Sequence, residues 1–458
     1  MTWALLVMGC LVVAVPARAQ TTLYTFNGDS VGDFFGVSVS GAGDVNGDGF
    51  ADLIVGAAQD DNNGADAGSA RVLSGLNGSV LYTFNGDSPF DFFGVSVSGA
   101  GDVDGDGYAD LIVGARGDDN NGERSGSARV FSGLDGSILY TFDGDSAADT
   151  FGASVSGAGD VNGDGFADLI VGAAQDDNNG FSSGSARVFS GLDGSILFTF
   201  DGDSAIDLFG ISVSGAGDVD GDGFADIIVG ARRDDNNGDS SGSARVFSGA
   251  DGSVLYTFNG DSPFDFFGGS VSGAGDVDGD GFADLIVGAH LDDNNGTDSG
   301  SARVFSGFDG SVLYTFDGDS GGDRFGLSVS GAGDVDGDSF ADLIVGAVFD
   351  DNNGTDSGSA RVISGLFVPP DALTLLEQLI QDVVDLNLQQ GINNSLDAKL
   401  DAVIQALQDV NENNDVAAIN ALQAFINAVQ AQSGIHIPVA DADALIAKAQ
   451  AIIDLLSL

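Results

Sequence analysis

The chain has 458 residues and carries 70 acidic against 14 basic side chains, a formal net charge of −56. A field of this sign disfavours nucleic acid and anionic membranes as partners. The hydrophobic fraction of 43% argues against the disorder that so acidic a composition otherwise favours. Cys10 is the only cysteine, so the chain has no disulfide framework.

Residues 1–19 are predicted to be a signal peptide. The apolar run Leu5–Val15 is followed by Pro16-Ala-Arg-Ala19, which fits the small-x-small pattern of a signal-peptidase site. A lipoprotein signal at Cys10 is disfavoured because Cys10 lies inside the apolar run. No later stretch reaches the eighteen or so apolar residues of a membrane span. We therefore expect a protein that is secreted or displayed at a bacterial cell surface, without direct membrane insertion.

A nine-residue acidic loop recurs six times, as in Asp218-Val-Asp-Gly-Asp-Gly-Phe-Ala-Asp226. The spacing is 58 residues, without insertion or deletion, and this constancy indicates a structural repeat. Carboxylates on alternate residues of a tight turn converge, and Ca²⁺ takes six to eight such oxygen ligands. The loops therefore predict up to six Ca²⁺ sites, with side-chain ligands at positions one, three, five and nine, a backbone carbonyl at position seven, and water.

The predicted metal ligands are Asp44, Asn46, Asp48, Phe50, Asp52, Asp102, Asp104, Asp106, Tyr108, Asp110, Asp160, Asn162, Asp164, Phe166, Asp168, Asp218, Asp220, Asp222, Phe224, Asp226, Asp276, Asp278, Asp280, Phe282, Asp284, Asp334, Asp336, Asp338, Phe340 and Asp342.

The loop differs from an EF-hand and from a plain hairpin turn. An EF-hand needs an acid at position twelve, where the first copy has Val55. Asp-Gly turns that merely form hairpins explain two acids per loop, but not three or four at alternate positions. Asn46 and Asn162 lower the charge of their loops, and Ser339 stands where a left-handed glycine is expected. The sixth site should therefore be the weakest.

Each unit contains four predicted strands, called D, A, B and C, here Ile138–Phe142, Phe151–Ser156, Ala167–Ala173 and Ser185–Ser190. Tandem four-stranded units are typical of β-propeller blades. Residues 21–366 therefore predict a mainly β fold, a six-bladed propeller.

The last copy of the repeat ends after its C strand. Leu23–Phe26 has the sequence of a D strand but no C strand precedes it. This N-terminal strand is expected to complete the last blade and so to leave no open edge.

The run from Phe209-Gly210 through the acidic loop to Gly230-Ala231 is shared by all units. It resembles the FG-GAP repeat of integrin α-subunit propellers and of many secreted bacterial proteins. The resemblance implies Ca²⁺ binding on one face and a role in adhesion or extracellular recognition. The familiar integrin ring has seven blades rather than six, and nothing in this chain resembles the integrin legs, transmembrane helix or inserted domain.

Two further features recur in every blade. Asp234-Asp-Asn-Asn-Gly238 follows the B strand, and its adjacent acids favour an Asx-rich turn over a second metal site. Arg245 has a counterpart in each blade and is expected to pair with a loop carboxylate, although bidentate binding of acidic sugars remains an alternative.

Residues 367–458 are predicted to form a second, helical domain, because glycine becomes rare after Pro369-Pro370 and apolar residues follow at helical spacing. Four short helices would make a small bundle. Their apolar faces are Leu376, Leu379, Val383 and Leu386; Leu396, Leu400, Val403 and Leu407; Ile419, Leu422, Ile426 and Val429; and Leu445, Ala449, Ile452 and Leu456. The runs Gly391–Leu400 and Ala424–Val429 resemble the small FIMAH module of bacterial extracellular proteins, which we interpret as an attachment or interaction module.

The chain is predicted not to be an enzyme. It has no G-x-S-x-G motif, and its two histidines, His290 and His436, lie in different domains, which disfavours a histidine triad or a zinc cluster. The expected function is extracellular recognition or adhesion, with a protein or glycan ligand. A structural surface or matrix component is the alternative, and a carboxylate-based glycan-active enzyme is less favoured.

The six copies differ mainly in the D-to-A and B-to-C connections, which should both lie on the face opposite the acidic loops. Aromatic and cationic residues stand there in an otherwise anionic protein, and such residues are enriched at binding hot spots. This comparison predicts a ligand site containing Arg232, Arg233, Phe264 and His290.

Overall fold

The structure is a computed structural model that describes residues 23–365 and, in the C-terminal part, residues 379, 380, 383, 386, 388, 392, 395, 396, 398–400, 402, 403, 414–433, 435–438, 442, 445, 446, 448–450, 452 and 453. The chain divides into two compact units, Met1–Gly365 and Leu366–Leu458. The predicted signal peptide lies outside the described residues.

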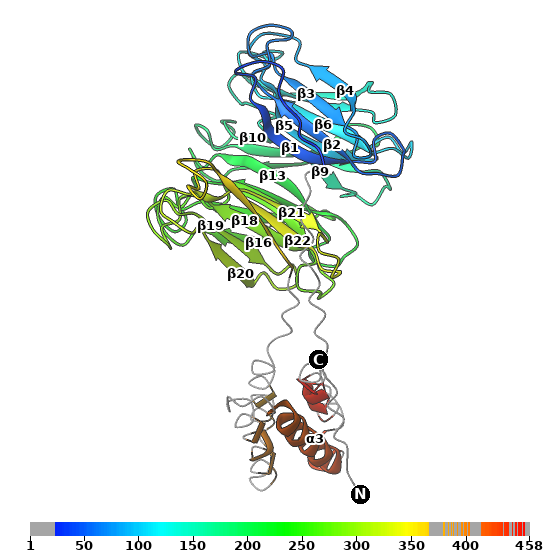
Figure 1. Ribbon diagram of the computed structural model, residues 1–458, viewed down its shortest axis with the longest axis vertical. Helices are drawn as coiled ribbons and strands as arrows, with labels where there is room; N and C mark the ends of the chain where they lie inside the picture. The colour runs from blue at the N-terminus through cyan, green and yellow to red at the C-terminus, as the bar shows by residue number, and fades with distance from the viewer. Residues whose placement is uncertain are drawn as a thin grey trace, which may run out of the picture. The chain divides into compact units, whose positions relative to one another are not determined.

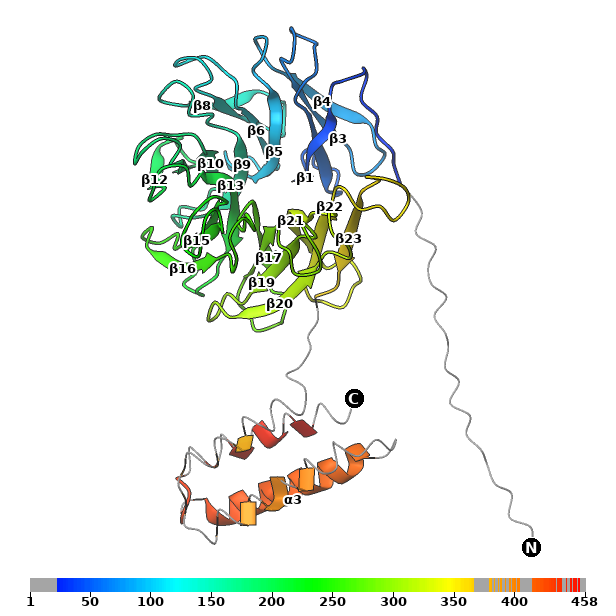
Figure 2. The same ribbon diagram turned by 90° about the vertical axis from the view of Figure 1, so that its left-hand side faces the viewer.

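The first unit is mainly β and forms the predicted six-bladed propeller, whose blades are arranged around a ring in Figure 2 and are labelled by strand in Figure 1. In blades 1 to 5, consecutive strands are antiparallel neighbours in the order A-B-C-D, and blade 6 has strands A, B and C within the described residues. The A-to-B and C-to-D connections therefore share one face of the ring, here called the metal-loop face. The B-to-C and D-to-A connections share the other, here called the opposite face.

The strands of the blades have the following bounds. Blade 1 has β1 (Phe35–Gly43), β2 (Asp52–Ala57), β3 (Ser69–Leu73) and β4 (Val80–Asn85); blade 2 has β5 (Phe93–Gly101), β6 (Asp110–Ala115), β7 (Ser127–Phe131) and β8 (Ile138–Asp143). Blade 3 has β9 (Ser154–Gly159), β10 (Asp168–Ala173), β11 (Ser185–Phe189) and β12 (Ile196–Asp201); blade 4 has β13 (Phe209–Gly217), β14 (Asp226–Ala231), β15 (Ser243–Phe247) and β16 (Val254–Asn259). Blade 5 has β17 (Ser270–Gly275), β18 (Asp284–Ala289), β19 (Ser301–Phe305) and β20 (Val312–Asp317); blade 6 has β21 (Phe325–Gly333), β22 (Asp342–Ala347) and β23 (Ser359–Ile363).

The burial of each strand follows from its position in the blade. The B strand β14 is buried along its whole length, as expected for a continuous β-branched apolar run with blades on both sides. The outer strand β16 is only partly buried, and its turn-proximal Val254 is exposed. Burial thus decreases from the inner strands of a blade to its outer strand, which is about half exposed.

The hydrophobic cores lie between neighbouring blades. Ile228 and Val246 of blade 4 share one buried cluster with Phe267 and Leu285 of blade 5. Phe267, the aromatic residue of the Phe-Gly pair, meets Phe305 edge-on with 6.1 Å between the ring centroids. A blade therefore completes its core only by packing against the next one.

The boundary between the first and last blades is packed less tightly than the others. Val39 in β1 is 66% exposed, whereas Val97 at the same position of blade 2 is 5% exposed. Val362 in β23 is 54% exposed, against 0% for Val304. The two blades face each other across a cavity of about 560 Å³, to which Phe26 also contributes.

The N-terminal segment lies where a D strand would approach blade 1. The Tyr24 hydroxyl donates to the carbonyl oxygen of Leu76 at 2.8 Å, as the Tyr82 hydroxyl in β4 donates to the carbonyl oxygen of the equivalent Leu134 at 3.1 Å. Leu23–Phe26 forms no strand, however, and the sheet of blade 6 has three strands within the described residues. Closure of the last blade by this segment stays a prediction.

The C-terminal unit has one buried core, which contains the apolar residues predicted from helical spacing, except those outside the described residues or at its margin. Helix α3 (Asn414–Gln432) confirms the third predicted helix. The predicted count of four helices is not supported, since α3 is the only helix whose bounds the described residues define. Apolar spacing identifies the buried face but does not fix helix continuity. Within the described residues, no helix combines the length and apolarity needed to cross a membrane.

We predict that a chain beginning at Asn27, which keeps the ion pair of Asp29 with Arg71, melts at a lower temperature than the chain beginning at Gln20. It should also self-associate, because the edge of β23 would lose its expected partner strand. Thermal denaturation and light scattering measure both effects. Tyr24→Phe, which removes only one hydrogen bond, is the control. Equal melting temperatures and a monomeric truncated chain would contradict the closure model.

Candidate metal centre

The acidic loops of at least three blades each bring three carboxylates together. In blade 4, oxygen atoms of Asp218, Asp220 and Asp226 all lie within 4.8 Å of one another. The equivalent groups of blades 2 and 5 are Asp102, Asp104 and Asp110, and Asp276, Asp278 and Asp284. These residues occupy positions one, three and nine of the loop, so the structure brings together ligands that the sequence separates by up to eight residues.

Backbone N–H groups hold the loop in a tight coil. In blade 4, Gly223 N donates to Asp218 Oδ2 at 3.1 Å and Phe224 N donates to Asp222 Oδ1 at 2.9 Å. Gly221 and Gly223 have φ of +75° and +93°, which a side chain would strain. The carboxylates are therefore oriented by the loop itself.

One carboxylate oxygen in two of the loops has no hydrogen-bond partner. Asp218 Oδ1 and its counterpart Asp102 Oδ1 are inaccessible to solvent and accept no hydrogen bond. A buried carboxylate oxygen without a donor is costly unless a cation coordinates it. The all-oxygen donor set and this unsatisfied atom fit a hard divalent cation such as Ca²⁺.

The ninth-position aspartate anchors the loop to the rest of the blade. Asp226 is fully buried, and its two oxygens accept hydrogen bonds from Val219 N at 2.7 Å and from Gly249 N at 2.9 Å. Burial raises the pKa of Asp226 to about 6, and burial likewise raises the pKa of Asp284 to about 7. A bound cation would favour the ionised carboxylates and so compensate this burial.

The loops with asparagine at position three keep the same geometry. Asn46 Oδ1 accepts a hydrogen bond from Asp48 N at 3.0 Å, and Asn162 Oδ1 accepts one from Asp164 N at 2.9 Å. Asp220 Oδ1 makes the equivalent contact with Asp222 N at 3.1 Å. The amide oxygen therefore stands in the carboxylate's place, with one negative charge fewer.

The aromatic residue at position seven links neighbouring loops. A Cβ added to Gly221 of blade 4 would lie 2.7 Å from Phe282 Cε1 of blade 5, and one added to Gly163 would lie 2.6 Å from Phe224 Cε1. These glycines are required because the next loop's ring covers their backbone. This contact links the six loops in series from blade 1 to blade 6, but it is missing between blade 6 and blade 1, where a Cβ added to Gly337 would meet nothing within 4 Å.

The sixth loop departs from this pattern as predicted. Ser339 has φ of 80°, close to the +92° of Gly281 at the same position of blade 5. A side chain in this left-handed conformation costs on the order of 1 kcal/mol relative to glycine. The sixth loop therefore carries strain that the other five lack.

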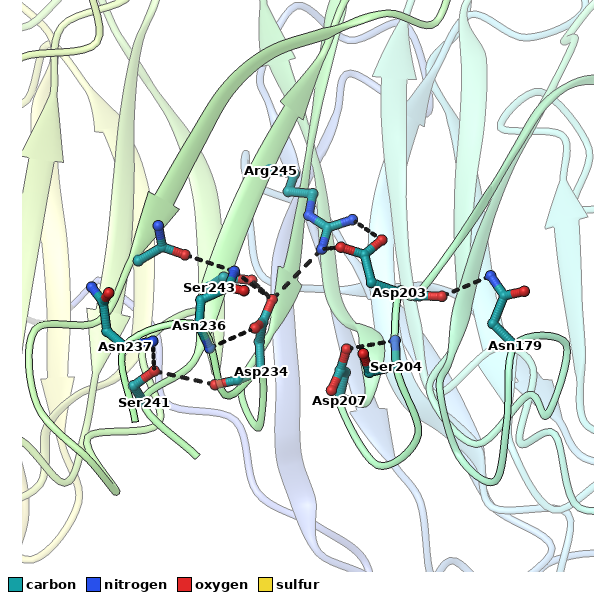
Figure 3. Close-up of polar contacts among 12 residues, drawn as sticks. Asn179, Asp203, Ser204, Asp207, Asp234, Asn236, Asn237, Ser241, Ser243 and Arg245 are labelled. Carbon is teal, nitrogen blue, oxygen red and sulfur yellow. Dashed lines mark hydrogen bonds and ion pairs between the residues drawn. The ribbon is translucent and has the colours of Figure 1, made fainter. Parts of the chain in front are cut away.

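A second set of carboxylates lies on the opposite face of each blade. Figure 3 shows this set in blade 4, where Arg245 lies between Asp203 and Asp234. Arg245 Nη1 donates to Asp203 Oδ1 at 2.8 Å, and Ser243 Oγ donates to Asp234 Oδ2 at 2.7 Å. Asp207 lies beside them and accepts a hydrogen bond from Ser204 N at 3.0 Å. The prediction that the repeated arginine pairs with a loop carboxylate is confirmed in all six blades.

The Asp-Asp-Asn-Asn-Gly stretch forms the expected turn. Asn236 N donates to Asp234 Oδ1 at 3.0 Å, and Ser240 N donates to Asp235 Oδ1 at 2.7 Å. Three carboxylates of such a set, for example Asp145, Asp149 and Asp176, also come within 4.8 Å of one another. The guanidinium already supplies positive charge to them, so we favour the structural interpretation over a second metal site.

The four residues predicted for a ligand site lie on the opposite face, in neighbouring connections. Arg233 lies over the Phe266 ring at 6.0 Å, and the same ring stacks on His290 at 5.8 Å. Burial and the nearby Arg232 lower the pKa of His290 to about 4, so the imidazole is neutral at pH 7. Phe264 is 54% exposed and belongs to the same connection as Phe266.

Sequence comparison missed Phe266 as the aromatic residue that joins Arg233 to His290. Its position immediately precedes the repeated Phe-Gly pair and has a left-handed backbone in all six copies, with φ between 52° and 56°. It also varies among the copies, which was a signal available in the sequence. The residues at this position are Phe34, Phe92, Thr150, Leu208, Phe266 and Arg324.

We predict that Ser339→Gly stabilises the calcium-loaded protein by about 1 kcal/mol, because glycine adopts the left-handed conformation without strain. The free energy of unfolding in denaturant measures the effect. The reciprocal substitution Gly281→Ser should destabilise by a similar amount. An unchanged or lowered stability of Ser339→Gly would contradict the backbone argument.

We predict a pH effect from the carboxyls of Asp149 and Asp265. Burial, followed by a hydrogen bond to a neighbouring aspartate, raises the pKa of each to about 7. An unfolded aspartate has a pKa near 4, so protonation of these two carboxyls stabilises the folded state fully below about pH 4. This contribution to the free energy of unfolding is lost as the pH rises to about 7.

The double variant Asp149→Asn and Asp265→Asn mimics the protonated carboxyls. In chelator, its melting temperature should exceed that of the unmodified chain at pH 8 and match it at about pH 4. Asp239→Asn, at an exposed side chain, is the control. A double variant that is destabilised equally at both pH values would show that the two carboxyls do not titrate in this range.

Comparison with known proteins agrees with this geometry. Five segments match the FG-GAP repeat family, at residues 35–73, 93–131, 151–189, 209–247 and 267–305. The chain is 33% identical to integrin alpha-5 of Xenopus laevis over 215 residues, which cover 43% of this chain and 20% of that protein. It is 31% identical to integrin alpha-V of Gallus gallus over 214 residues, which again cover 43% of this chain and 20% of that protein.

Integrin alpha-4 of Xenopus laevis is 33% identical over 171 residues, 34% of this chain and 16% of that protein. The chain thus spans about a fifth of the length of these relatives. The sixth copy of the repeat is not among the matched segments, although it forms β21–β23. The chain therefore carries five segments that match the FG-GAP repeat within its six-bladed β-propeller, and it is similar over part of its length to integrin α proteins.

Proposed function

We propose that the chain is a calcium-binding propeller that acts as an extracellular recognition or adhesion module. The observation that carries this proposal is the convergence of three carboxylates in the loop of an integrin α-type propeller, one with a buried and unsatisfied oxygen, Asp218 Oδ1. The other loops repeat the ligand pattern, so up to six Ca²⁺ ions are expected. The predicted signal peptide supports export to a compartment where Ca²⁺ is plentiful.

Calcium supplies positive charge and no reaction step in this proposal. The side chains at positions one, three, five and nine and the carbonyl at position seven would hold the ion. Its role is to neutralise the clustered carboxylates and so to fix the A-to-B connections, which join the A strand of each blade to its B strand. Ca²⁺ is favoured over Mg²⁺ because an irregular shell of many oxygens suits the larger ion.

Recognition is assigned to the opposite face, where the loops vary without disturbing the metal sites. Arg232, Arg233, Phe264 and His290 are the proposed contact residues for an extracellular protein or glycan. The likeness to integrin α proteins supports adhesion as the general class. The FIMAH-like C-terminal unit is proposed to serve attachment.

We predict that an excess of chelator lowers the melting temperature and that added Ca²⁺ restores it, because ligand bound to the folded state raises stability. Extracellular calcium modules bind at about 10⁻⁴ to 10⁻³ M, so millimolar Ca²⁺ should suffice. Differential scanning calorimetry with and without chelator measures the shift. Asp218→Asn should reduce the shift, whereas Asp239→Asn should leave it unchanged.

A melting temperature that is insensitive to chelator would contradict calcium binding. The recognition half of the proposal has a separate readout, which is capture of extracellular matrix or cell-envelope material with and without Ca²⁺. Alanine at the four contact residues should abolish capture and preserve the calcium-dependent melting. Capture that survives these substitutions would place the ligand site elsewhere.

A further inference from the structure

The arginines of the propeller fall into two groups. Residues 23–365 contain eleven arginines, and one arginine in each blade forms the ion pairs described above. The other five form no ion pair within residues 23–365, despite 70 acidic side chains in the whole sequence. They are Arg116, Arg124, Arg232, Arg233 and Arg324.

All five lie on one face of the ring. Arg116 and Arg124 belong to the connection between β6 and β7, and Arg232 and Arg233 to the connection between β14 and β15. Arg324 directly precedes β21. These are B-to-C and D-to-A connections, so every arginine without a carboxylate partner stands on the opposite face, away from the acidic loops.

Three of these arginines share a cavity. Arg116, Arg124 and Arg232 line a volume of about 140 Å³ together with the hydroxyl-bearing Thr150 and the amide-bearing Gln175. The lining comes from blades 2, 3 and 4, with no carboxylate among its residues. The volume suits a small group with several oxygen atoms, such as a carboxylate or a sulfate.

The positive charge continues towards blades 5 and 6. Arg233 and Arg324 lie over the rings of Phe266 and Phe349, at 6.0 Å and 4.9 Å from the ring centroids. Arg116 lies over Phe92 at 5.4 Å in the same manner. Such stacking orients a guanidinium and leaves its N–H edge available for an anion. We call the five arginines without an ion pair the arginine belt.

The belt residues repel one another in the absence of an anion. Burial, followed by the charge of Arg124, lowers the pKa of Arg116, and burial, followed by the charge of Arg233, lowers that of Arg232. Arg232 and Arg324 also contribute to the lowered pKa of His290. An anionic ligand would relieve this repulsion.

We propose that the arginine belt binds an acidic polysaccharide, with one carboxylate or sulfate group in the cavity of Arg116, Arg124 and Arg232 and further anionic groups on Arg233 and Arg324. The inference rests on the proposed recognition function and names the chemistry of its ligand. Guanidinium groups pair with carboxylate and sulfate oxygens through two parallel hydrogen bonds.

The surroundings favour a polysaccharide over an acidic peptide. The belt spans connections of several blades, which fits a linear polymer with charges at intervals. Phe90 and Phe264 on the same face are 56% and 54% exposed, and offer flat apolar surfaces for sugar rings. The face is built of loops, so an extended peptide finds no strand edge to which it can add.

The test is calorimetric titration of the calcium-loaded chain at one free Ca²⁺ concentration. The probes are heparin, which is sulfated, polygalacturonate, which is carboxylated, neutral dextran, and poly-glutamate. Arg116→Gln with Arg232→Gln removes two belt charges. Lys399→Gln with Lys448→Gln removes the same charge from the other unit and is the matched control. The melting temperature with and without chelator is measured on the same samples.

We expect one or both acidic polysaccharides to bind and dextran not to bind. The arginine variant should lose at least about tenfold in affinity, since hydrogen bonds to charged groups are among the strongest in proteins. The lysine variant should bind normally. Which polymer binds distinguishes sulfate from carboxylate.

Three results would overturn the proposal: no binding of either acidic polysaccharide, equal affinity of the arginine variant, or binding of poly-glutamate alone. If calcium-dependent melting persists in any of these cases, the failure concerns the belt's ligand and not the calcium module.

Discussion

Repulsion among clustered carboxylates is the constraint on which this propeller depends. Two carboxylates 4 Å apart repel by about 4 kcal/mol at the effective dielectric of a protein surface. Each metal loop holds three or four, and the sequence repeats the loop six times. A fold with so many close anions is stable only where each cluster has a positive partner.

The two faces of the ring provide that partner in different ways. On the opposite face, one arginine per blade pairs with the carboxylates, so the neutralising charge is part of the chain. On the metal-loop face, the A-to-B and C-to-D connections of residues 23–365 contain no arginine or lysine. We propose that an ion from solution neutralises those loops, which would make stability dependent on the calcium concentration. The fold would thereby separate a fixed structural charge from an exchangeable one.

Neighbouring blades enforce the same local geometry on one another. Gly210, the glycine of the Phe-Gly pair, has φ of +81°, and a Cβ there would lie 2.1 Å from the carbonyl oxygen of Ser185 in the preceding blade. From the second loop to the sixth, the aromatic ring at position seven covers a glycine of the loop before it, as Phe340 covers Gly279. The exact 58-residue period is therefore a packing requirement, since an insertion in one blade would displace contacts in two.

Much of this was predictable from the sequence, because a constant period, β-branched runs and alternate acids each have a direct structural meaning. The six blades, their strand order and the pairing of Arg245 all followed from those patterns. The loose packing between blades 1 and 6 was not predictable, because the sequence of Leu23–Phe26 indicates a strand propensity but not the strand with which the segment pairs. The continuity of the C-terminal helices did not follow either, since spacing predicts which residues are buried and not where a helix ends.

The arginine belt was only partly predictable. Comparison of the repeats found Arg232, Arg233 and His290, because a cation in a variable loop is visible in sequence. It did not indicate that Arg324 and Phe266 lie near these residues, because Arg324 and Phe266 belong to D-to-A connections. The D-to-A and B-to-C connections come together only because the antiparallel strands return to the same face of the ring. A shared site built from several blades needs the ring geometry, which no single repeat contains.

The central claim is that exchangeable cations neutralise the acidic loops. Native mass spectrometry of the chain, first stripped of metal and then supplied with Ca²⁺, tests it most directly. We expect a series of bound states that ends at six Ca²⁺ ions per chain, with the ion of the sixth loop lost first on dilution because of Ser339. A chain that stays free of Ca²⁺ at millimolar concentration while fully folded would contradict it.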